Sequence, residues 1–187
     1  MFGCMPRLML TVGTIGISAL TVADAIFKYF AITHLTDGRS ERLLPFIDFT
    51  VHRNPGITGD IAIPLWIVIP LTIGILLFLV DRASTTYRKK PITFFGILAV
   101  IAGATNNLID RIINGFTTDY LMFFSTSIIN LSDVVIIGGA LIIMVYNANN
   151  PQAQCTLIPS SPPIHQYGVV SRMFRSIVRT FRNTSHR

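Results

Sequence analysis

The chain has 187 residues, of which 51% are hydrophobic and 13% are charged, and its formal net charge is +6. In soluble domains about a quarter of the residues are charged. The low charged fraction of this chain and its mean hydropathy of +0.58 therefore indicate a membrane protein. The positive charge does not indicate nucleic acid binding. Most Lys and Arg residues lie in short segments between apolar runs and in the C-terminal tail, and they do not form a face on which basic and aromatic side chains alternate.

Four apolar stretches are long enough to cross a bilayer, which requires about 20 residues. They cover residues 8–32, 61–80, 92–113 and 128–146. Lys and Arg are concentrated between the second and third stretches and near the C-terminus, whereas the segment between the first two stretches carries only Arg39, Arg42 and Arg53. The positive-inside rule therefore predicts that both termini face the cytoplasm. The charged residues inside the stretches then lie near the outer leaflet.

The predicted fold class is an all-α membrane protein with four transmembrane helices in residues 1–150. Residues 36–60 are predicted to form a small external interfacial or β-like element between the first two helices, and 46–53 is the only convincing strand. Residues 151–187 are predicted to form a cytoplasmic linker and a basic tail. In the tail, 169–181 has the spacing of an amphipathic helix on the membrane surface, although a disordered basic tail fits equally well.

Several carboxylates lie inside or beside the predicted helices, where a charge costs about 2.5 to 3.5 kcal/mol at mid-bilayer. Structural ion pairs are one explanation, and they would join Asp110 to Arg111 and Asp24 to Lys28, which lies one turn further along. A pathway for protons or ions is a second explanation. Catalysis by two converging aspartates is the third.

Asp119 and Asp133 fit the third explanation because no Lys or Arg lies between them in the sequence. A tight hairpin between the last two helices can bring the two carboxyl groups together. Two neighbouring carboxyl groups share a proton, so that one acts as a base and the other as an acid, as in aspartic proteases. A buried polar pair that only joins two helices also fits this spacing. A small proton-coupled or ion-coupled transporter is a further alternative, but the sequence lacks the repeats or broken helices typical of one.

Five short motifs, in order, resemble those of the lipoprotein signal peptidase (signal peptidase II) family. The family pattern contains Asp-x-x-x-Lys, Asn-x-Gly, Asn-Leu-x-Asp-Arg, Asp-Phe and Asn-x-Ala-Asp. The corresponding residues here are Asp24-Ala-Ile-Phe-Lys28, Asn54-Pro-Gly56, Asn107-Leu-Ile-Asp110-Arg111, Asp119-Tyr120 and Asn130-Leu-Ser-Asp133. Each motif alone is weak, but the ordered set on four apolar stretches is specific.

The resemblance implies an aspartic endopeptidase whose catalytic pair is Asp119 and Asp133. Its substrates would be prolipoproteins whose Cys carries diacylglycerol, cut just before that Cys in a bacterial inner membrane. No metal or other cofactor is implied, and we expect a monomer in contact with membrane lipid. The resemblance also implies supporting roles at the site, or in the ion pairs named above, for Asn54, Gly56, Asn107, Asp110, Arg111, Asn130, Asp24 and Lys28.

The chain departs from the family pattern at several positions beside these motifs. Asn106 replaces a Gly, Tyr120 replaces a Phe, Ile129 replaces a Phe and Ser132 replaces an Ala, while 57–59 lacks the small and aromatic residues of the family. We expect the hydroxyl of Ser132 to lie beside the catalytic pair. These departures indicate a divergent member, and they leave the preferred cleavage sequence open. The histidines are scattered, which argues against a metal site or a Ser/His triad.

Overall fold

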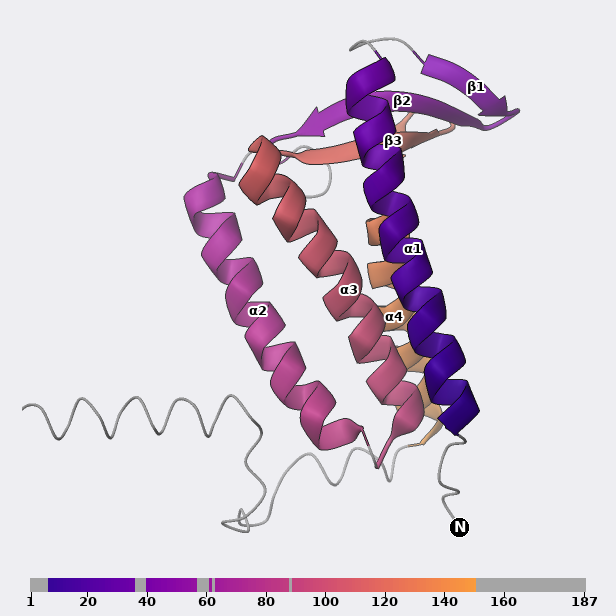
Figure 1. Ribbon diagram of the computed structural model, residues 1–187, viewed down its shortest axis with the longest axis vertical. Coiled ribbons are helices and arrows are strands. Elements are labelled where there is room, and N and C mark those ends of the chain that lie inside the picture. Colours follow the sequence, from indigo (N-terminus) through magenta and orange to yellow (C-terminus); the bar gives the residue numbers. More distant parts are fainter. Residues whose placement is uncertain (1–6, 36–39, 57–60, 62, 88, 151–187) are drawn as a thin grey trace, which may run out of the picture.

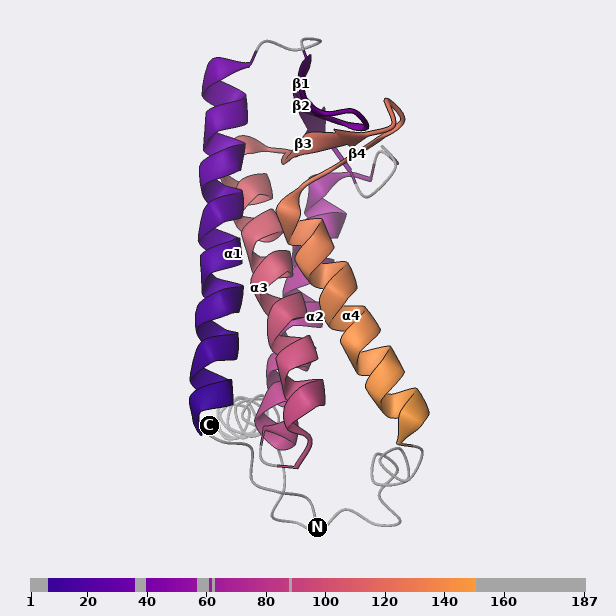
Figure 2. The same cartoon turned by 90° about the vertical axis from the view of Figure 1, so that its right-hand side faces the viewer.

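The computed structural model describes residues 7–35, 40–56, 61, 63–87 and 89–150. Four long helices stand side by side, and a small sheet lies across one end of them (Figure 1, Figure 2). The helices are α1 (Arg7–His34), α2 (Leu65–Thr86), α3 (Pro91–Asn114) and α4 (Leu131–Asn149). The strands are β1 (Ser40–Leu44), β2 (Ile47–Asn54), β3 (Thr117–Phe123) and β4 (Ser127–Ile129).

All four helices are long and apolar enough to span a membrane, which confirms the predicted fold class. Their ends differ from the predicted limits by a few residues for local reasons. Helix α2 begins after Pro64, and α4 begins only at Leu131 because Ile128 and Ile129 pair in β4. The predicted tail helix at 169–181, like the rest of 151–187, lies outside the described residues.

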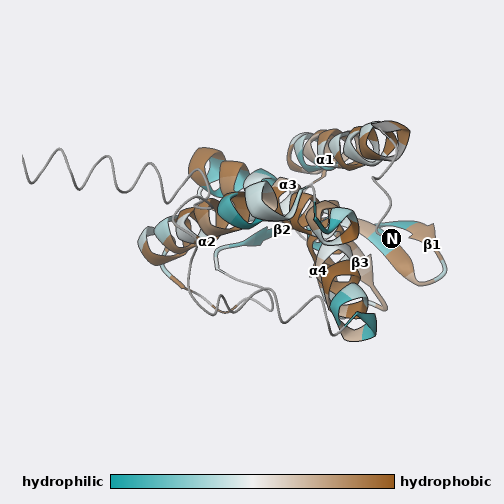
Figure 3. Ribbon diagram, turned by 90° about the horizontal axis from the view of Figure 1, so that it is seen from below, coloured by the Kyte–Doolittle hydropathy of each residue, from teal (hydrophilic) through white to brown (hydrophobic). Residues whose placement is uncertain are grey.

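Large apolar side chains cover the outer surfaces of the helices. Figure 3 shows hydrophobic residues along all four helices, and exposed examples on α2 include Trp66, Leu71 and Phe78. Within its described length, α2 buries only Val68 and Ala83. Such a surface suits contact with lipid, since only helices with satisfied backbones and apolar exteriors are stable in hydrocarbon.

Helices α3 and α4 approach each other closely along a seam of glycines. A Cβ atom on Gly139 would lie 2.6 Å from the carbonyl oxygen of Gly96, and one on Gly103 would lie 2.7 Å from the carbonyl oxygen of Ser132. Small residues allow this approach, and it favours van der Waals packing in a membrane, where helices gain little hydrophobic energy by associating. The seam fixes the ends of α3 and α4 that reach the sheet.

The sheet is antiparallel with the order β1-β2-β3-β4, so its central pair joins two loops that are far apart in the sequence. In this pairing His52 lies opposite Asp119 and Asn54 lies opposite Thr117. The prediction that only 46–53 forms a strand was wrong, because β1, β3 and β4 also form. Thr, Tyr and Phe in β3 favour a strand, but its pairing partner β2 comes from another loop, which local sequence patterns do not reveal.

A small apolar core connects the sheet to α1. It contains Ala31, Phe49, Val51 and Tyr120, all of them buried. The rings of Phe49 and Tyr120 have centroids 5.6 Å apart, and the ring of Phe27 on α1 lies 5.8 Å from that of Tyr120. Aromatic pairs at such separations are favourable beyond the area they bury. The core therefore holds β2 and β3 against the end of α1, directly beside the polar cluster described next.

Candidate active site

The innermost polar contacts join α1 to α3. Asp24 and Lys28 on α1 are almost completely buried, and the Lys28 ammonium lies 3.2 Å from the Asp24 carboxylate, which confirms the predicted ion pair. The same ammonium donates to Oδ1 of Asn107 at 2.6 Å and lies 3.5 Å from Asp110. Lys28 therefore offsets two buried carboxylates, each of which would be costly in this setting without a cation.

Asp110 pairs with Lys28, so the predicted pairing with Arg111 was wrong. Consecutive residues on a helix point in different directions, and neighbours in sequence therefore rarely form an ion pair. The Asp110 carboxylate also accepts hydrogen bonds from the backbone N–H of Thr118 at 2.6 Å and from Nδ2 of Asn114 at 2.6 Å. It thus connects the end of α3 to the start of β3, and this connection places Asp119.

Asp119 lies on β3 and is only 3% exposed. Asn130 donates to its Oδ1 at 2.6 Å, and Asn54 donates to its Oδ2 at 3.1 Å. Both donors are neutral amides that arrive from different elements, since Asn54 ends β2 and Asn130 precedes α4. Asn54 of the Asn-x-Gly motif and Asn130 of the Asn-x-Ala-Asp motif therefore bind the same carboxylate, that of Asp119.

Asp133 lies in the first turn of α4 and forms a capping box with Asn130. The Asn130 side chain accepts from the backbone N–H of Asp133 at 2.9 Å, while the Asp133 carboxylate accepts from the backbone N–H of Asn130 at 3.3 Å. Asn107 on α3 donates to Oδ1 of Asp133 at 2.9 Å. Because Asn130 contacts both Asp119 and Asp133, one residue joins the two acids across the hairpin.

The three asparagines share one arrangement that orients their amide groups. Each Oδ1 accepts from a separate donor: the backbone N–H of Gly56 for Asn54, the Lys28 ammonium for Asn107 and an N–H of α4 for Asn130. Because an amide has its oxygen and its NH2 group on opposite sides, the NH2 group of each asparagine faces a carboxylate. The spacing of the Asn-x-Gly motif follows from the contact between Asn54 and Gly56.

The electrostatic environment of Asp119 favours the protonated carboxyl group. Burial raises its pKa to about 6, the hydrogen bond from Asn54 opposes this rise, and the negative charge of Asp133 adds to it. Within the described part of the chain, no ion pair joins a Lys or Arg to either Asp119 or Asp133. A carboxyl group without a basic partner and next to another acid can retain a proton near neutral pH.

Arg111 and Gly56 form the edge of the cluster. Nη2 of Arg111 donates to the carbonyl oxygen of Gly56 at 3.1 Å, so α3 is tied to the end of β2. Gly56 has no room for a side chain, because a Cβ atom there would collide with the backbone carbonyl of Ile61. The Nε atom of Arg111 is buried and makes no hydrogen bond to any described residue.

Three residues noted only as departures from the family pattern also belong to the cluster. Asn106, Tyr120 and Ser132 all donate to the carboxylate of Asp24. The expectation that the Ser132 hydroxyl lies beside the catalytic pair was wrong, since it donates to Asp24 at 2.7 Å. The sequence did contain a sign that these three residues belong to the cluster. Each replaces an apolar or small residue of the family pattern with one that forms hydrogen bonds, and buried polar groups need hydrogen-bond partners.

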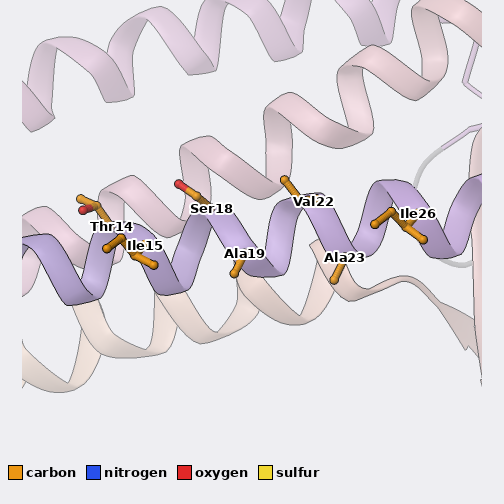
Figure 4. A pocket seen from close by; sticks show the side chains of 7 residues that line it. All are labelled: Thr14, Ile15, Ser18, Ala19, Val22, Ala23 and Ile26. Atoms are coloured by element: carbon orange, nitrogen blue, oxygen red, sulfur yellow. The ribbon is translucent and has the colours of Figure 1, made fainter.

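A shallow hollow runs along α1 and is not lined by the polar residues of this cluster. It is lined by Thr14, Ile15, Ser18, Ala19, Val22, Ala23 and Ile26, all from one helix (Figure 4). Its lining is largely apolar and contains none of the acids described above. Among the residues that the structure describes, no group of three or more His, Cys, Asp or Glu side chains could hold a metal ion.

Comparisons with known proteins identify similar sequences and folds. A family model described as Signal peptidase (SPase) II matches residues 17–148. A protein named lipoprotein signal peptidase from Bartonella bacilliformis is 36% identical over 138 residues, which cover 70% of this chain and 84% of that protein. A protein of the same name from Brucella ovis is 31% identical over 130 residues, covering 65% of this chain and 80% of that protein.

Two solved structures described as bacterial membrane enzymes share the fold. One has a TM-score of 0.66 and 23% sequence identity, and the match covers 75% of this chain and 94% of that chain. The other has a TM-score of 0.67 and 22% identity, and it covers 82% of this chain and 95% of that chain. At these identities the structures support the arrangement of the helices and the sheet.

Proposed function

The chain belongs to the signal peptidase II family, and from this premise we propose that it removes signal peptides from prolipoproteins as an aspartic endopeptidase. The relatives named above are lipoprotein signal peptidases, and this chain spans most of their length. The observation that carries the proposal is the convergence of Asp119 and Asp133 on Asn130. Among the residues that the structure describes, the hydrogen-bond donors to their carboxylates are all neutral.

In the proposed reaction the two acids share one proton. The ionised carboxylate removes a proton from a water molecule, whose oxygen bonds to the carbonyl carbon of the substrate. The protonated carboxyl group gives its proton to the carbonyl oxygen, and a tetrahedral diol forms. When the carbon–nitrogen bond breaks, one carboxyl group protonates the leaving amine and the other removes a proton from the diol. The pair then again holds a single proton.

The asparagines and the glycine hold this pair in place. Asn54 and Asn130 orient Asp119, while Asn107 and the first turn of α4 orient Asp133. Neutral amides stabilise a negative carboxylate less than a cation would, so they leave proton exchange between the acids possible. Holding both reactive groups in one geometry before the substrate binds is a main source of enzymatic rate enhancement.

The proposed substrates carry diacylglycerol on the Cys that follows the cleaved bond, and the membrane would deliver them laterally. The proposed location is a bacterial inner membrane, with the sheet and the acids at the outer leaflet and both termini in the cytoplasm. The charges support this orientation, since Arg82, Lys89 and Lys90 lie at the end of the bundle opposite the sheet (Figure 1). We propose that the protein acts as a monomer.

The test uses the full chain in membranes with a diacylglyceryl-modified prolipoprotein. Asp119→Asn and Asp133→Asn should each abolish cleavage, whereas Asp48→Asn, the same change elsewhere in the sheet, should cleave normally. Mass spectrometry of the product should place the lipidated Cys at its new N-terminus, and an unacylated precursor should remain uncut. Normal turnover in either site variant would remove the assignment of the pair. No turnover by the wild type on several precursors would favour an ion-coupled transporter.

A further inference from the structure

Three side chains from three elements converge on the carboxylate of Asp24, which is fully buried. Asn106 and Ser132 donate to its Oδ2 at 2.6 and 2.7 Å, and the Tyr120 hydroxyl donates to its Oδ1 at 2.8 Å. The backbone N–H of Ser132 and the ammonium of Lys28 each lie 3.2 Å from the same carboxylate. A carboxylate offers about four lone-pair sites, so Asp24 is fully occupied.

A fully occupied carboxylate has no free site for substrate, but its partners connect it to the residues of the proposed reaction. The relevant partner is Lys28, whose ammonium donates to Oδ1 of Asn107 at 2.6 Å. Nδ2 of Asn107 in turn donates to Oδ1 of Asp133 at 2.9 Å. The ammonium therefore determines which end of the amide faces Asp133. If the amide were reversed, its oxygen would face a carboxylate oxygen and the contact would be repulsive.

We infer that Asn106, Tyr120 and Ser132 are positioning residues that fix Asp24, and that Asp24 thereby holds Lys28 and Asn107 in the orientation that serves Asp133. The inference rests on the function proposed above, in which Asp133 is catalytic. It assigns a shared role to three side chains on α3, β3 and α4 that do not contact Asp133 through their own polar groups.

The nature of the three residues supports this role. At these positions the family pattern has Gly, Phe and Ala, so each departure adds a hydrogen-bond donor. All three donors meet on one acceptor rather than at separate places. A buried hydroxyl or amide without a partner is costly, and Asp24 is the acceptor that all three groups share. Asn106 also donates to Ser132 Oγ at 3.2 Å, and the Tyr120 hydroxyl accepts from the backbone N–H of Leu131 at 3.3 Å. They form one unit together with Asp24.

Two substitutions that each remove a single oxygen atom test the inference. Tyr120→Phe and Ser132→Ala restore residues found in the family pattern, so the fold accommodates them. In each variant we expect kcat to fall about tenfold with KM changed less than about twofold, because a displacement of about 1 Å at a reacting group can cost about a hundredfold. Tyr29→Phe, on the exposed side of α1, and Ser127→Ala, exposed on β4, are the matched controls and should retain wild-type kcat.

A second measurement distinguishes positioning from a purely structural role. Asn107→Ala removes the hydrogen bond through which Lys28 and Asn107 act on Asp133. Asp133 keeps its hydrogen bond from the backbone N–H of Asn130. In this background Tyr120→Phe should cause no further loss of kcat, although it should still lower the melting temperature. Losses of kcat that multiply in the double variant would overturn the inference. If Asn107→Ala is too slow to measure, the kcat values of the single variants decide.

The proposed function and this inference fail in different ways. Wild-type kcat in both Tyr120→Phe and Ser132→Ala, measured on an active wild-type protein, overturns the inference and leaves the proposed function in place. A wild-type protein that cleaves no acylated precursor overturns the proposed function, and the inference falls with it. A fall in kcat confined to the two variants, with both controls unchanged, supports both.

Discussion

Removing the amide of Asn54 should shift the pH dependence of cleavage. The pKa of Asp119 is about 6, and the hydrogen bond from Asn54 to its Oδ2 at 3.1 Å lowers it by favouring the charged form. A hydrogen bond to a charged group contributes about 1.5 to 3 kcal/mol. Since about 1.4 kcal/mol corresponds to one pKa unit, complete loss would raise the pKa by about 1 to 2 units. In Asn54→Ala, water that enters the vacated space restores part of the lost hydrogen bonding, so we expect the pKa of Asp119 to rise by about 1 unit.

The sign of the effect follows from the shared proton. In the proposed mechanism, cleavage requires one proton on the pair of Asp119 and Asp133, and this proton is lost as the pH rises. The alkaline limb of kcat/KM, which reports the free enzyme, should therefore have its midpoint near pH 6 in the wild type. A higher pKa retains the proton to higher pH, so the limb of Asn54→Ala should move to about pH 7.

The assay measures kcat/KM for the acylated precursor from about pH 4 to about pH 9. The matched control is Asn149→Ala, which makes the same change at an exposed position at the far end of α4. Its profile should coincide with that of the wild type. An alkaline limb that stays in place in Asn54→Ala, or that moves to lower pH, would refute the assignment of Asn54 as the hydrogen-bond donor that tunes Asp119.

Three further substitutions test the frame around the site. Gly139→Ala should lower the melting temperature, at a cost of about 1 to 3 kcal/mol, because its Cβ would lie 2.6 Å from the carbonyl oxygen of Gly96. A Cβ atom on Gly138 would meet nothing within 4 Å, so Gly138→Ala should leave the melting temperature unchanged. Equal melting temperatures for the two variants would contradict the close packing of α3 and α4 at these glycines. Lys28→Met should destabilise the protein by about 3 to 5 kcal/mol, because it leaves two buried carboxylates without a cation, and an unchanged melting temperature would contradict this. Gly56→Ala should reduce kcat/KM by displacing the backbone that binds Asn54, and wild-type activity would argue against that contact.

The membrane helices could be predicted from the sequence because their signal is local. A run of about 20 apolar residues has few other stable structures in a bilayer, so the composition of each stretch is sufficient. The ion pair of Asp24 and Lys28 could also be predicted, since residues four apart share a helical face. The same rule argued against pairing Asp110 with the adjacent Arg111, and the structure places Asp110 against Lys28 instead.

The contacts between distant elements could not be predicted in this way. The strand β3 pairs with β2 across a large separation in sequence, and the residues of β3 do not show which partner they have. Asn54 and Asp119 were assigned to one site only through the family resemblance, and their hydrogen bond depends on that strand pairing. The position of the Ser132 hydroxyl depends on the rotation of α4 against α1, which sequence spacing does not define.

The sheet draws its central strands from two separate loops, and this has a consequence for the order in which the protein is made. A ribosome releases β2 and its Asn54 early, but β3, Asn130 and Asp133 emerge only with the last quarter of the helical part of the chain. An incomplete polypeptide ending before Asn130 has one acid of the pair, Asp119, and lacks both Asn130 and Asp133. In the proposed mechanism, the nascent protein therefore cannot cleave neighbouring polypeptides until α4 has been synthesised and has joined the other helices.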